Sequence, residues 1–135
     1  METRPTTDAP GTLTPPSSPA AAFRQAFARE HETTMRVLRA FPPDRADFRP
    51  HDRSNTAQQL AWTFVVEEHM MRLALDGARI IGGDFPRPPG TWDETLAALD
   101  AARDEVLRRL DDPARARLDG VVQFFTGPGE VGDYA

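Results

Sequence analysis

The chain has 135 residues and a formal net charge of −5, which suits one domain and argues against a general nucleic-acid binder or a protein on an anionic membrane surface. It contains no cysteine, which excludes a disulfide framework, a thiolate zinc site and a cysteine nucleophile. No apolar run reaches the length of a membrane span and no signal-peptide pattern opens the chain, so we expect a cytoplasmic protein with no nucleic-acid or membrane partner.

Residues 1–19 are rich in proline, serine and threonine, and their only large aliphatic residue is Leu13. Such a segment buries too little apolar surface to offset the entropy lost on ordering. We therefore predict a disordered tail over 1–19 and a helical-bundle domain over 20–135.

The first helix is predicted near 20–41. Apolar residues recur at helical spacing from Phe23 to Phe41, and the pair Pro42-Pro43 ends the run. A proline-bearing linker follows.

The next two helices each begin with a capping box, in which a threonine and a residue three positions later satisfy each other's backbone N–H groups. Thr56 with Gln59 predicts a helix over about 55–76, apolar almost all round and therefore the most buried. Thr91 with Glu94 predicts a helix over 91–110.

The last part of the chain is ambiguous. Residues Val121 to Phe125 fit a short strand, and they fit equally an apolar cluster that covers one end of the bundle. The segment Val131-Gly132-Asp133 resembles the start of a further helix. We predict three antiparallel helices and almost no strand.

Three stretches, taken in order, resemble the DinB-like superfamily of four-helix-bundle proteins: MRVLRAFPPDRADFRPHDRS, TAQQLAWTF and FFTGPGEVGDYA. The resemblance covers about residues 22–135. It implies an all-α, up-down helical bundle with three long helices present and the fourth, which would follow Ala135, missing. It also implies a divalent metal, zinc or nickel, and a metal-dependent hydrolase or thiol transferase.

The resemblance also implies three histidine ligands, one directly after the Leu-Ala-Trp element and two in the last helix. Here Thr63 follows Leu60-Ala61-Trp62, and the last helix is absent. None of the ligands can be carried over, so we expect this chain to bind no divalent metal tightly, and the sequence names no catalytic residue.

Polar residues on apolar helix stripes are the remaining site candidates. Glu30 lies on the stripe of the first helix, and Thr63 and Glu67 share a face of the second. Inward carboxylates build metal sites in helical bundles, so these three could line a polar pocket. In the alternative, both glutamates lie at helix edges and reach water or an arginine, and His31 and His69 are packed or surface residues.

Two functions follow from these patterns. The first is a DinB-like metal-dependent enzyme with an incomplete metal site and an unknown small-molecule substrate. The second is a non-catalytic interaction module that hides its uncovered apolar faces by forming a homodimer.

Overall fold

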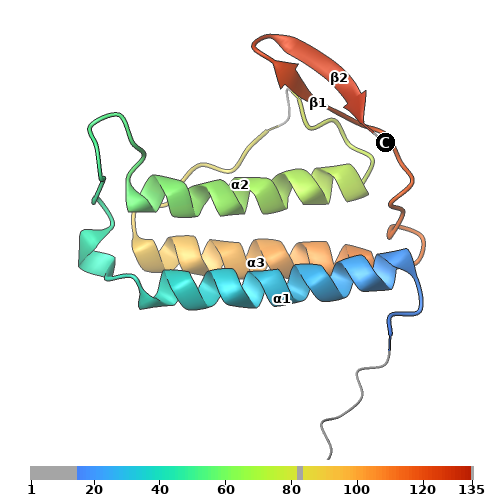
Figure 1. The fold of residues 1–135 in the computed structure, drawn as a ribbon, viewed down its shortest axis with the longest axis horizontal. Helices are drawn as coiled ribbons and strands as arrows, with labels where there is room; N and C mark the ends of the chain where they lie inside the picture. Colours follow the sequence, from blue (N-terminus) through green and yellow to red (C-terminus); the bar gives the residue numbers. More distant parts are fainter. Residues whose placement is uncertain (1–14, 82–83, 135) are drawn as a thin grey trace, which may run out of the picture.

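The protein consists of three long helices and one β-hairpin (Figure 1), seen in a computed structural model that describes residues 15–81 and 84–134. The elements, in chain order, are the helix α1 (Pro19–Ala40), the 3₁₀ turn η1 (Pro43–Arg45), the helices α2 (Ala57–Leu75) and α3 (Trp92–Leu110), and the strands β1 (Val122–Gly127) and β2 (Glu130–Tyr134). The three predicted helices are confirmed.

The helix ends follow the predicted capping chemistry. Both capping boxes form: the side chain of Thr56 accepts from the backbone N–H of Gln59, and that of Thr91 accepts from the N–H of Glu94. After α2, Gly77 adopts a φ of 67° and donates to the carbonyl of Ala74. Glycine adopts this left-handed conformation without steric cost, which is why α2 stops there.

The helix α1 begins at the last residue of the predicted N-terminal tail. Ser18 is the N-cap of α1 and accepts from the N–H of Ala21, and Pro19 is the first residue of the helix. Both therefore belong to the bundle. Residues 1–14 of the predicted tail lie outside the described residues.

The direction of α3 differs from the prediction. Gln58, in the first turn of α2, donates to the carbonyl of Thr91 at the start of α3 (3.2 Å). At the other end, Arg109 of α3 donates to Asp76, which caps the end of α2 (2.7 Å). These contacts make α2 and α3 parallel, so the predicted up-down order of three antiparallel helices is wrong for this pair.

The helix α1 runs antiparallel to α3. The rings of Phe41 and Trp92 pack at one end of this pair, tilted by 38° with centroids 5.1 Å apart, and Arg24 forms an ion pair with Asp111 at the other end. In a parallel pair, the segment between α2 and α3 has to run back along the length of α2. It can do so because an extended residue spans more than twice the 1.5 Å rise of a helical residue.

The core lies around α3. Met35 of α1, Val65 of α2 and Leu99 of α3 form its centre. α3 carries more buried residues than α2, so the prediction that the second helix is the most buried is wrong. The apolar residue Leu60 of α2 remains 57 % exposed because no described segment covers its side of the helix.

The C-terminal residues form an antiparallel hairpin, with Val122 paired to Tyr134 and Phe125 to Val131. The strand alternative for Val121 to Phe125 is thus the correct one. The fold is mostly helical rather than all-α, and Val131-Gly132-Asp133 belongs to β2 and does not begin a helix. The hairpin projects away from α2 (Figure 1), and the residues at its open end, Val122 and Tyr134, border a groove at the C-terminal end of α2. No helix among the described residues is long and apolar enough to cross a bilayer.

Candidate functional site

A polar cluster joins the three helices near the middle of their lengths. His31 of α1 has a side chain only 3 % exposed, and its two ring nitrogens face two carboxyl groups. Nε2 lies 3.1 Å from Oδ1 of Asp100 on α3, and Nδ1 lies 4.0 Å from Oε1 of Glu68 on α2. His31 points inward because it lies one turn before the core residue Met35, and Glu68 lies one turn after Val65.

Asp100 orients the imidazole ring. Its carboxylate accepts from Nε2–H of His31 and, through its other oxygen, from Arg39 (3.0 Å). In neutral imidazole only one nitrogen carries a proton, so Nδ1 then presents a lone pair to Glu68.

Glu68 is the most perturbed carboxyl group of the cluster. Burial, and to a smaller extent the negative charge of neighbouring Glu67, raise its pKa from 4.5 to about 7, against the lowering effect of Arg103. Its Oε2 is buried and has no hydrogen-bond partner among the described residues. A carboxyl group that titrates near neutral pH in this way is suited to proton transfer.

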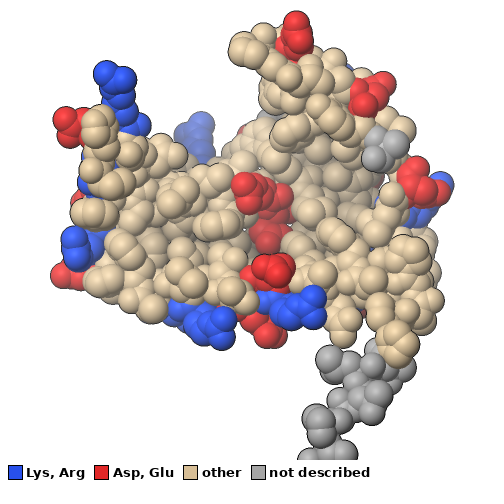
Figure 2. All heavy atoms as spheres, viewed as in Figure 1, with Lys and Arg blue, Asp and Glu red and all other residues tan. Residues whose placement is uncertain are grey.

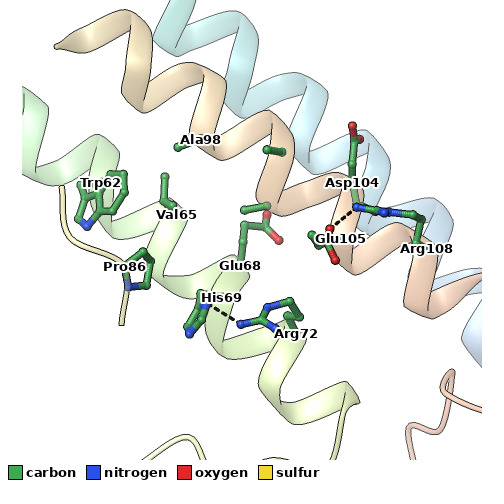
Figure 3. A pocket seen from close by; sticks show the side chains of 12 residues that line it. Trp62, Val65, Glu68, His69, Arg72, Pro86, Ala98, Asp104, Glu105 and Arg108 are labelled. Carbon is green, nitrogen blue, oxygen red and sulfur yellow. Dashed lines mark hydrogen bonds and ion pairs between the residues drawn. The ribbon is translucent and has the colours of Figure 1, made fainter. Parts of the chain in front are cut away.

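Glu68 also lines a groove between α2 and α3 with a volume of about 480 Å³ (Figure 3). The close-up shows its carboxyl group between the two helices, with Trp62 and Pro86 farther along the groove and Arg72 and Arg108 near the other end. The groove therefore combines apolar walls with a charged rim, as small-molecule sites commonly do.

His69 holds the loop that borders this groove. Its Nε2 donates to the carbonyl oxygen of Asp84 (3.0 Å), and its Nδ1 accepts from Arg72 (3.0 Å). The edge of the ring contacts Phe85, with centroids 5.5 Å apart. Both ring nitrogens of His69 are therefore used in hydrogen bonds that hold this loop and Arg72.

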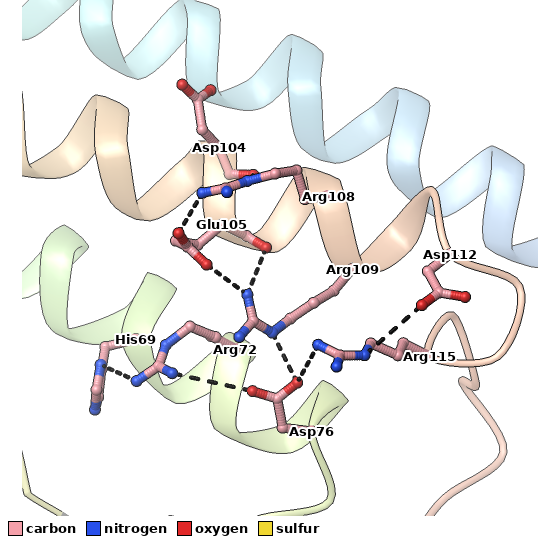
Figure 4. Close-up of polar contacts among 9 residues, drawn as sticks. All are labelled: His69, Arg72, Asp76, Asp104, Glu105, Arg108, Arg109, Asp112 and Arg115. Atoms are coloured by element: carbon pink, nitrogen blue, oxygen red, sulfur yellow. Dashed lines mark hydrogen bonds and ion pairs between the residues drawn. The ribbon is translucent and has the colours of Figure 1, made fainter.

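An ion-pair network fixes the end of the groove where α2 and α3 finish (Figure 4). Arg109 donates to Asp76 and to Glu105, both at 2.7 Å, and Arg108 also pairs with Glu105. The hydrogen bonds from Arg109 lower the pKa values of Asp76 and Glu105. These carboxylates stay ionised and balance the arginines, in contrast to Glu68.

The three sequence candidates lie elsewhere. Glu30, Thr63 and Glu67 are all exposed, and the hydroxyl of Thr63 donates to the carbonyl of Gln59 (3.2 Å). Figure 2 shows acidic side chains across the middle of the face that carries α1 and α2. None of the three borders the groove described above. Their role as pocket-lining residues stays a prediction.

Sequence reasoning missed Glu68 by one position. Adjacent helix residues point about 100° apart, so only one of Glu67 and Glu68 can share the buried face of Val65. The spacing from Ala61 and Val65, both buried, identifies Glu68. This spacing is hard to recognise in the sequence because α2 is apolar over most of its circumference, so no single face stands out as the buried one.

The donors present do not fit the metal site that the family resemblance implies. The two nitrogens of His31 point to opposite sides of its ring, so Glu68 and Asp100 cannot meet one ion together with it. Thr63 stands where the resemblance implies a histidine. No group of three potential ligands converges within residues 15–81 and 84–134.

Fold and site together define a mostly helical protein with a carboxyl–histidine cluster beside an inter-helix groove. The family model described as DinB superfamily matches residues 26–134. The chain therefore belongs to the DinB superfamily, and the resemblance noted in the sequence is confirmed. Comparisons with curated proteins and with solved structures gave no match.

Proposed function

We propose that this DinB-superfamily protein binds a small molecule in the α2–α3 groove and that Glu68 exchanges a proton with it. The observation that carries the proposal is the position of Glu68 in the groove, with an oxygen that has no partner among the described residues. The reaction class that the family resemblance favours is hydrolysis or thiol transfer.

Glu68 suits both reactions in the same way. As a carboxylate it takes the proton of an attacking water or thiol, and as a carboxylic acid it returns a proton to the leaving group. A pKa of about 7 keeps both forms populated at neutral pH. The ring of His31 lies 4.0 Å from this carboxyl group, and Asp100 holds that ring in place.

The test is NMR spectroscopy of the isotope-labelled protein. We expect the carboxyl carbon of Glu68 to titrate near pH 7, and a panel of small fragments that includes glutathione to shift the signals of Trp62 and Val65. The Glu67→Gln variant is the matched control for fragment binding because it leaves the groove intact. Since the charge of Glu67 helps to raise the pKa of Glu68, the titration of Glu68 should move to lower pH in this variant. Fragments that shift only residues outside the groove, or a Glu68 that titrates at its ordinary value, contradict the proposal.

A second candidate function is a non-catalytic interaction module that acts as a homodimer. It is favoured by uncovered apolar side chains on α1 and α2, since Val37 is 64 % and Leu60 57 % exposed. Between these helices lies a largely apolar groove of about 230 Å³, which Phe64 helps to line. Analytical ultracentrifugation tests this function: a dimer that Leu60→Ser dissociates supports it, and a monomer at all concentrations contradicts it.

A further inference from the structure

We propose that the α2–α3 groove selects an amphipathic organic cation, whose apolar body packs on the groove walls and whose primary ammonium group donates to the Glu68 carboxylate. This inference rests on the proposed function, because it takes the same groove as the binding site and names the class of its ligand.

The apolar body follows from the walls of the groove. The indole of Trp62, the side chain of Val65 and the ring of Pro86 form one side, and Ala98 and Ala102 form the other. Alanines on α3 leave room next to α2, which is where the space for a ligand arises. The volume of about 480 Å³ falls within the usual range of small-molecule sites.

The positive charge follows from how the groove's own charges are paired. Arg108 is engaged by Glu105, and Arg72 donates to His69 and lies 4.0 Å from Asp76. An anionic ligand would therefore have to compete with contacts already formed on both arginines. It would also bring its charge towards carboxylates on both helices.

Glu68 is the member of this groove that still needs a donor. The charged or titratable groups around it come from all three helices: Glu67, His69 and Arg72 of α2, Arg103, Asp104, Glu105 and Arg108 of α3, and His31 of α1. Arg103 makes its ion pair with Asp104 (3.2 Å), and Nδ1 of His31 lies 4.0 Å from Oε1 of Glu68, beyond hydrogen-bond distance. An ammonium group supplies both the hydrogen bond and the charge that these neighbours leave unmet.

The same geometry predicts a pH dependence. Only ionised Glu68 attracts an ammonium group, and its pKa is about 7. The ionised fraction rises roughly tenfold between about pH 6 and pH 8. Binding of the amine should strengthen by about this factor over the interval, while the amine itself stays protonated.

The experiment compares three probes that share one apolar body: 2-phenylethylamine, 2-phenylethanol and phenylacetate. Each is titrated into the labelled full chain at pH 8 and pH 6, and the indole N–H signals are followed. Trp62 lines the groove, whereas Trp92 packs on Phe41 at the end of the bundle and serves as an internal control.

We expect the amine to shift Trp62 but not Trp92, and to bind at pH 8 about ten times more tightly than the alcohol, since a hydrogen bond to a charged group contributes at least that factor. Glu68→Gln should abolish this preference, and Glu67→Gln should retain it. The pH comparison uses the unaltered chain and so does not depend on how a variant folds.

Two outcomes overturn the inference in distinguishable ways. If the alcohol or phenylacetate shifts Trp62 as tightly as the amine, or if both glutamine variants behave alike, the ligand class is wrong while the groove remains a binding site. If no probe shifts Trp62 at either pH, the inference fails together with the groove that the proposed function assigns.

Discussion

Replacing Glu68 by glutamine should stabilise the protein at neutral and alkaline pH. Glutamine keeps the shape of the side chain and removes the negative charge. In the folded protein Glu68 lies between helices with its side chain 13 % exposed, and its pKa is raised from 4.5 to about 7. The folded state therefore holds this proton more tightly than the unfolded chain does.

The size and the sign of the effect follow from that difference. Below about pH 4.5 the carboxyl group is protonated in both the folded and the unfolded state, so the free energy of unfolding has its full value there. As pH rises towards 7 the unfolded chain loses the proton first, so the free energy of unfolding falls. One pKa unit corresponds to about 1.4 kcal/mol, so the total loss by pH 8 is about 3 kcal/mol.

Urea denaturation at pH 5, 6, 7 and 8 measures this dependence. The difference in unfolding free energy between Glu68→Gln and the unaltered protein should grow with pH and level off above about pH 7. Glu67→Gln is the control, because Glu67 is exposed and its replacement should change stability by less than about 0.5 kcal/mol. A difference that stays constant with pH would refute the reasoning that burial holds the Glu68 proton.

Three further predictions concern the core, a helix cap and the metal. Leu99→Ala should lower the free energy of unfolding by about 2–5 kcal/mol in urea titrations, because Leu99 is 1 % exposed at the centre of the core. Thr91→Ala should cost about 1 kcal/mol by the same measurement through loss of the α3 cap, whereas Thr91→Ser should restore most of it. Isothermal titration calorimetry should show no sub-micromolar binding of zinc or nickel to this chain, and tight binding that Glu67→Gln abolishes would restore Glu67 as a ligand candidate.

Local sequence signals determined the helices of this protein. The threonine capping boxes, Gly77 and the Pro42-Pro43 pair specify where backbone hydrogen bonding starts and stops, and these signals act between residues only a few positions apart. The stretches on which the superfamily resemblance rests are of the same local kind, and the family-model match confirms that resemblance.

The short apolar run before the hairpin shows where local signals become ambiguous. A strand and an apolar cluster demand the same residues over Val121 to Phe125, and only the pairing with Val131 to Tyr134 distinguishes them. That pairing is a contact between two segments, and the periodicity of one segment does not predict it.

The direction of α3 and the membership of the polar cluster depend on contacts between helices. Helical periodicity tells which residues share a face but not which partner covers that face or which way the partner runs. The contacts of Asp76 with Arg109 make α2 and α3 parallel, and the covering of α2 by α3 turns Glu68 inward and leaves Glu67 in solvent. His31, Glu68 and Asp100 lie on three different helices, so their chemistry exists only once those helices pack.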